Sequence, residues 1–101
     1  LDGEAYATVS NDPPRDVIAK SVSAVNEAVA AGQIRNFTCT GNTAEVEPAF
    51  WLALDAQGKR GLTLALANAC LAQNSGHRIT VSSSQSGRTL AEYSAGSYKV
   101  H

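Results

Sequence analysis

The strongest hydrophobic pattern in the chain lies at about residues 60–74 and predicts a helix. Its apolar residues recur at helical spacing on two opposite faces, with Leu62 and Leu66 on one face and Leu64 and Leu71 on the other. A helix that is apolar on both faces needs cover on more than one side. The segment is shorter than the roughly 20 residues that span a bilayer. We therefore expect a buried core helix and no membrane insertion.

Alternation of apolar and polar residues predicts strands on both sides of this helix. In one of them, alternation directs Phe37 and Cys39 towards the core. Residues 56–58 are expected to form a loop that leads into the helix. A short edge strand is also conceivable at residues 5–9. The predicted strands cover residues 33–40, 45–55, 77–84, 88–94 and 97–101.

Residues 15–31 fit two structures. Their β-branched residues favour a strand at residues 16–25. However, Ile18, Val22, Val25 and Val29 also repeat at helical spacing. We favour the strand, and a helix is the alternative.

This order of elements predicts a single domain over residues 1–101, of the α+β class and mainly β. Short antiparallel strands around one helix are typical of a small barrel of the oligosaccharide-binding (OB-fold-like) type, in which the helix closes one end. The alternative is an open antiparallel sheet with the helix on one face.

The composition is that of an ordinary folded protein, with 44% hydrophobic and 17% charged residues. The net charge is −1 and the basic residues are scattered along the chain. Nucleic-acid binders usually carry a basic face and a high isoelectric point, so we expect no nucleic-acid partner.

The chain has two cysteines, Cys39 and Cys70. A start at Leu-Asp-Gly-Glu without Met fits a secreted chain whose signal peptide has been removed. In an oxidising compartment the two cysteines would form a disulfide, whereas two buried thiols are the alternative. Two cysteines and two distant histidines lack the spacing of metal ligands, so we expect neither a metal nor another cofactor.

Short pieces spread over most of the chain match the pattern of a known family, namely Ala5-Tyr6, Ser10, Val17-Ile18, Gly32-Gln33-Ile34, Phe37-Thr38-Cys39, Ser75-Gly76 and Arg78-Ile79-Thr80-Val81. In these pieces the chain resembles the B subunits of secreted bacterial toxins of the subtilase-cytotoxin and pertussis-like group. This resemblance implies a small barrel, a homopentameric ring, binding to host-cell glycans, no catalysis by this chain, and a separate catalytic A subunit as partner. The chain departs from that group in having only two cysteines, one of them in the helix, and in the insertion at residues 11–14.

A glycan site needs hydroxyl and amide groups for oriented hydrogen bonds, together with an aromatic face. The resemblance points to Ser10, with Tyr6 beside it, as sugar-binding residues. Thr40, Asn42 and Thr43, in the loop after Cys39, are the next candidates for the rim of such a site.

An oligomer needs an interface between the copies of the chain. Trp51 alternates with the apolar residues of its predicted strand, so we expect it at a subunit interface. Leu64 and Leu71 lie on the second apolar face of the core helix, which a neighbouring subunit would cover in a ring.

Two other functions remain open, namely a small secreted hydrolase or ribonuclease and a periplasmic interaction or inhibitor protein. The hydrolase would pair His77 with a glutamate, Glu45, Glu47 or Glu92, for general acid–base catalysis. His101 is a second histidine for the same set.

Asn36-Phe37-Thr38 matches the acceptor pattern for N-linked glycosylation. An inward Phe37 within a regular strand makes modification there improbable.

Overall fold

The structure is a computed structural model that describes residues 13–101. It has an α+β architecture, as predicted, but it is not mainly β, because its helices hold more of the described residues than its strands do. The helices are α2 (Arg15–Ala30), α3 (Pro48–Ala53) and α4 (Ala56–Ala72). The strands are β1 (Ile34–Thr38), β2 (Thr43–Val46), β3 (Arg78–Ser83), β4 (Thr89–Ser94) and β5 (Ser97–Val100).

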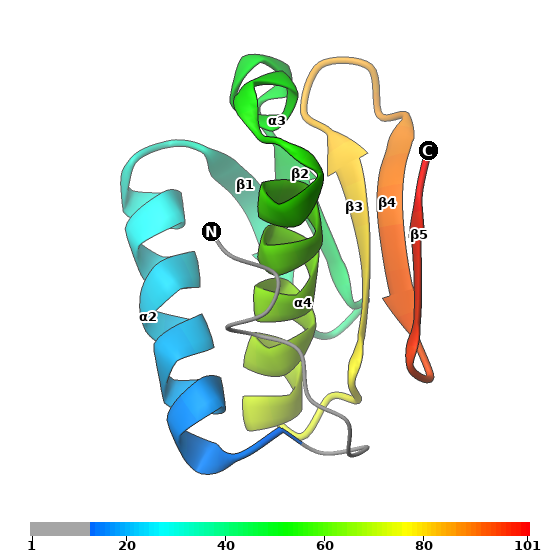
Figure 1. The fold of residues 1–101 in the computed structure, drawn as a ribbon. Coiled ribbons are helices and arrows are strands. Elements are labelled where there is room, and N and C mark those ends of the chain that lie inside the picture. The colour runs from blue at the N-terminus through cyan, green and yellow to red at the C-terminus, as the bar shows by residue number, and fades with distance from the viewer. Residues whose placement is uncertain (1–12) are drawn as a thin grey trace.

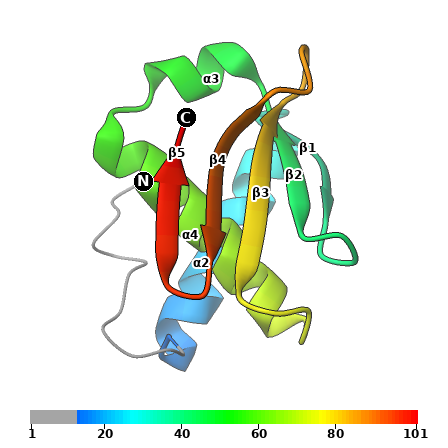
Figure 2. The ribbon, with the colours of Figure 1, turned by 90° about the vertical axis from the view of Figure 1, so that its right-hand side faces the viewer.

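The strands form one sheet in the order β1-β2-β3-β4-β5. All neighbours are antiparallel except β2 and β3, which are parallel and are joined through α3 and α4. Helices α2 and α4 lie together on one face of the sheet (Figure 1), and the view in Figure 2 looks onto the opposite face, which no helix of residues 13–101 covers. The sheet is not closed, so the expected barrel is not formed. The open-sheet alternative is closer, although the parallel pair makes the sheet mixed.

Helix α4 is the buried core helix that the sequence predicts, and it begins earlier than expected. Residues 56–58, expected as a loop, form its first turn. Asp55 caps this turn, because its Oδ1 accepts a hydrogen bond from Gly58 N at 2.7 Å. Leu62, Leu64 and Leu66 are all buried. The helix packs against α2 and against β3 and β4, so both of its apolar faces are covered within one chain.

The strand favoured at residues 16–25 is wrong, and the helical alternative is confirmed as α2. Its buried residues are Ser21, Val25 and Ala28. Packing against α4 therefore overrides the strand preference of its β-branched residues. Val29, which completes the apolar repeat, is 44% exposed.

The strand expected at residues 45–55 is also wrong beyond its first residues. Strand β2 ends at Val46, and α3 begins at Pro48 because a proline is well suited to the first helical position. In this short helix Trp51 is 3% exposed and Leu52 is 76% exposed. The alternation in the sequence predicts the reverse, with Leu52 facing inward and Trp51 facing outward.

Strand β1 contains an irregularity that changes which residues face inward. Asn36 has a φ of 50°, and the pairing of β1 with β2 shifts register between Arg35 and Thr38. Asparagine tolerates this left-handed conformation better than most residues do. Phe37 and Cys39 pack on the core as predicted, and Ile34 is buried as well. A regular strand could not direct residues 34, 37 and 39 to the same side.

The strands after α4 agree with the sequence prediction. Residues 77–84, 88–94 and 97–101 contain β3, β4 and β5 respectively. The edge strand considered at residues 5–9 lies outside the described residues.

Cys39 and Cys70 form a disulfide with a Cα–Cα distance of 5.1 Å, which confirms the predicted bridge. It ties the end of β1 to the last turns of α4, and both cysteines are buried. Disulfides persist mainly in oxidising compartments, so this one is consistent with secretion. Among residues 13–101, no helix has the length and apolar character needed to cross a membrane.

Candidate functional site

The face of the sheet opposite α2 and α4 is lined by polar side chains, and we call it the polar face. On β3 these side chains alternate with the buried Ile79 and Val81, so they point away from the helices. Strand pairing brings equivalent residues of the neighbouring strands beside them. The central residues of the polar face are Thr43, Glu45, Arg78, Thr80, Ser82, Glu92 and Lys99.

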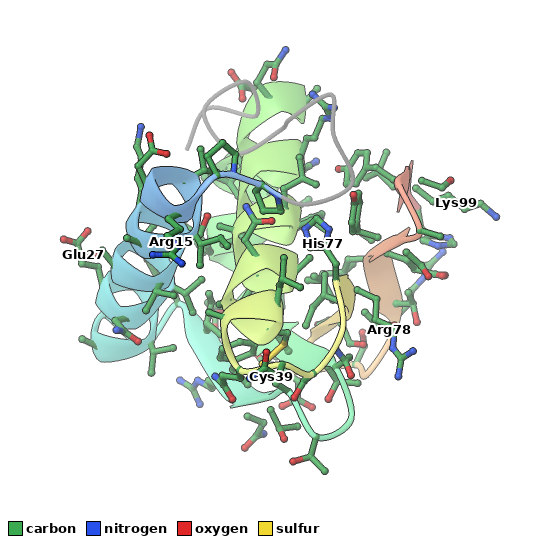
Figure 3. All side chains as sticks on the ribbon, turned by 90° about the horizontal axis from the view of Figure 1, so that it is seen from below. Arg15, Glu27, Cys39, His77, Arg78 and Lys99 are labelled. Carbon is green, nitrogen blue, oxygen red and sulfur yellow. A yellow bond between two sulfur atoms is a disulfide. The ribbon has the colours of Figure 1, made fainter. Side chains whose placement is uncertain are left out.

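Opposite charges face each other across the strands of the polar face. Glu92 pairs with Lys99, and Arg35 pairs with Glu45. Such cross-strand pairs stabilise a sheet modestly. Arg78 and Lys99 lie on the opposite side of the molecule from Glu27 of α2 (Figure 3). The polar face thus offers hydroxyl, carboxylate and cationic groups together.

A shallow hollow of about 180 Å³ lies where the loop after Cys39 meets the ends of β3 and β4. Asn42 is buried at its wall, and its Nδ2 donates hydrogen bonds to Ser75 O at 2.8 Å and to Arg78 O at 3.1 Å. Asn42 therefore anchors the loop to the start of β3. The residues that line the hollow are Gly41, Asn42, Arg78, Ile79, Thr80, Glu92, Tyr93 and Ser94.

The sequence-predicted rim residues occupy different positions around this hollow. Thr43 is exposed on the polar face and pairs with Thr80. Thr40 is exposed in the loop. Both amide hydrogens of Asn42 are engaged within the chain, so its side chain acts mainly by shaping the loop. Tyr6 and Ser10 lie outside the described residues.

Sequence reasoning did not assign Arg78, Thr80 or Glu92 to a ligand-binding site, although it considered Glu92 as a catalytic partner for His77. The alternation in residues 77–84 already marked Arg78 and Thr80 as the polar side of a strand. That Glu92 lies opposite Thr80 depends on the register of β3 with β4, which no local pattern specifies.

The two histidines have different surroundings. His101 Nε2 lies 3.3 Å from Glu92 Oε1 beside the polar face, with side chains that are 46% and 43% exposed. His77 Nε2 lies 2.6 Å from Asn68 Oδ1, and its ring meets the Tyr93 ring edge-on at a centroid distance of 4.9 Å. Glu92, one of the glutamates considered for His77, thus contacts His101.

His77 belongs to a chain of hydrogen bonds that passes between α2 and α4. Ser21 Oγ donates to Val17 O at 2.7 Å and accepts from Asn68 Nδ2 at 3.0 Å. This orients Asn68 with its Oδ1 towards His77, so His77 must carry a proton on Nε2. Figure 3 shows His77 beside α4. The network satisfies two polar side chains, Ser21 and Asn68, that are fully buried.

The residues expected at a subunit interface are covered to different degrees. Trp51 and Leu64 are each 3% exposed within one chain, and Leu71 is half-buried. Lys59 Nζ lies 5.7 Å from the centroid of the Trp51 ring. Trp51 and Leu64 therefore have almost no surface to offer a neighbouring subunit. An oligomer would need an interface elsewhere on the chain.

Within residues 13–101, no group of three or more His, Cys, Asp or Glu side chains is arranged to hold a metal ion. The candidate site is the polar face and the hollow at its edge. Comparison of the chain with protein-family models, curated proteins and solved structures finds no match.

Proposed function

We propose that the chain is a secreted, non-enzymatic binding module. Its ligand is polar, with a cell-surface glycan as the leading candidate, and it binds on the polar face of the sheet. The observation that carries this proposal is the combination of an uncovered polar sheet face with a hollow at its edge. Glycans are bound through several oriented hydrogen bonds, and Arg78, Thr80 and Glu92 supply donors and acceptors around one hollow. The disulfide supports the secreted location.

The arrangement of aromatic residues limits which glycan contacts are available. Tyr93 lines the hollow, but its ring packs against His77 and the core. We therefore expect recognition by hydrogen bonding and charge, with little stacking of sugar rings on aromatic faces. Acidic sugars fit this site best, because Arg78 can donate charge-assisted hydrogen bonds to a carboxylate.

A glycan array followed by titration of the best-bound glycan tests this proposal. Arg78→Ala should weaken binding by about tenfold or more, because a hydrogen bond to a charged group contributes about 1.5–3 kcal/mol. Glu27→Gln, on the exposed side of α2, is the matched control and should leave binding unchanged. Absence of binding to any glycan, or equal affinity for wild type and Arg78→Ala, would refute the site.

A ring-forming B subunit of a toxin is a narrower form of the same proposal. Weak sites on several identical subunits gain avidity of about 10²–10⁴ when they engage one surface. Such a ring would need an interface other than Trp51 and Leu64, since both are covered within the chain. Mass measurement of the intact protein in solution decides between this form and a monomeric module.

A hydrolase is the second candidate, and the contact between His101 and Glu92 favours it. A histidine beside a carboxylate can exchange protons with a substrate, and Arg78 at the same face could stabilise negative charge. RNA cleavage that is lost in His101→Ala and retained in Gln73→Ala would support this function. Cleavage that is instead lost in His77→Ala would identify His77 as the acid–base histidine.

A further inference from the structure

Asn36, Phe37 and Thr38 form the only Asn-X-Ser/Thr triplet in the 101 residues. This is the acceptor pattern for N-linked glycosylation, and it arises often by chance. Its value as a modification site therefore depends on where the fold places its members. In a regular strand beside an inward Phe37, the triplet would be a poor acceptor.

The irregularity in β1 gives the triplet a favourable position. Asn36, with its φ of 50°, sits where the β1–β2 register shifts, and its side chain is exposed. Thr38 is also exposed, whereas Phe37 packs on the core. The two residues that define the acceptor are thus open to solvent while the residue between them is anchored. A large substituent on Asn36 needs no rearrangement of the core.

The local contacts of Asn36 are compatible with a substituent on its side-chain nitrogen. Asn36 Nδ2 donates a hydrogen bond to Glu45 Oε1 at 2.6 Å. A primary amide has two N–H groups, and a sugar replaces only one of them. The remaining N–H can keep the bond to Glu45.

We propose that Asn36 is a site of N-linked glycosylation during secretion. In this step Asn36 Nδ2 forms a bond to the anomeric carbon of a lipid-pyrophosphate-linked oligosaccharide. The bond from that carbon to the pyrophosphate oxygen breaks, the lipid pyrophosphate leaves, and one amide proton passes to a base. Nothing is oxidised or reduced. The Cys39–Cys70 disulfide independently fits passage through an oxidising secretory compartment.

A glycan at this position would also shield an exposed sheet edge. Strand β1 is an edge strand of the sheet among the described residues. Edge strands present unpaired backbone groups that can recruit another chain, and natural proteins commonly block them. The glycan on Asn36 would add a bulky, hydrated group beside that edge.

Expression in a eukaryotic secretory host tests the assignment. Intact mass and gel mobility are measured before and after treatment with a peptide-N-glycosidase, and peptide mapping locates the modified residue. We expect one glycan per wild-type chain, lost in both Asn36→Gln and Thr38→Val and retained in Thr38→Ser. Loss in two variants that change different side chains separates modification from a folding defect.

The double variant Asn36→Gln/Ser84→Asn is the positive control. It removes the natural triplet and creates a new one at residues 84–86, in the turn between β3 and β4, where residues 85 and 86 are exposed. Only a host that glycosylates this double variant is used for the comparison with the wild-type chain. An unmodified wild-type chain in the same host would overturn the proposal, as would a glycan that persists in Asn36→Gln.

Discussion

Reduction of the Cys39–Cys70 disulfide should destabilise the fold substantially. The cysteines are 31 positions apart. In the chain-entropy model, opening a loop of this size costs about 3–4 kcal/mol, because the unfolded chain regains freedom that the bridge removes. A domain of this size has a total stability of about 5–15 kcal/mol. The bridge therefore accounts for a large part of the stability.

Urea denaturation of the oxidised and the reduced protein measures this effect. With a denaturant slope of about 1–3 kcal/mol/M, the midpoint should fall by roughly 2 M on reduction. Trp51 is the single tryptophan and is buried, so its fluorescence follows unfolding. Reduced wild-type protein is the cleanest comparison, because it keeps both sulfur atoms in the core. A midpoint that moves by less than about 0.5 M would refute this reasoning.

Three further predictions concern stability, each measured by denaturant unfolding. Asn68→Ala should lower the free energy of unfolding by about 2–4 kcal/mol, because it leaves a cavity and removes the oxygen that accepts a hydrogen bond from His77 Nε2. The control Gln73→Ala, at an exposed position, should change it little. Asp55→Ala should lower the free energy of unfolding by about 1 kcal/mol, because it removes the cap of α4. Asp55→Asn should keep most of the stability that the cap provides. Burial raises the pKa of Tyr98, although the charge of Arg60 opposes the rise, and its hydroxyl is buried with no hydrogen-bond partner among residues 13–101. Because the unfolded chain releases the Tyr98 proton more readily, wild-type protein should keep its full stability below pH 10 and lose stability as the pH rises through the higher folded-state pKa. Tyr98→Phe removes the unpaired hydroxyl, so it should be at least as stable as wild type below pH 10 and should lose less stability at alkaline pH; equal alkaline losses would contradict this.

The sequence predicts the parts of the fold in which one local pattern dominates. The core helix is apolar on two faces, and β3 alternates cleanly, so both are found where expected. The disulfide follows from two cysteines at buried positions, one just after β1 and the other in α4. In each case burial and local pattern lead to the same structure.

The errors arise where two patterns compete or where distant segments meet. Residues 15–30 carry both β-branched residues and a helical repeat, and contact with α4 selects the helix. Residues 48–53 alternate like a strand, but Pro48 is also a helix-start signal that outweighs the alternation. The open sheet and the position of Glu92 beside Thr80 depend on strand pairing, which is not encoded within either strand alone.

The parallel pairing of β2 with β3 has a consequence for the order of folding events. Thr43 and Thr80 pair across it, although α3 and α4 separate them along the chain. Bringing such distant residues together is slow, because the intervening chain must first give up its freedom. Cys39 and Cys70 lie only four and ten residues from these paired positions. Once the bridge has formed, the search for this contact becomes almost local, and the oxidised chain should refold faster than the reduced one.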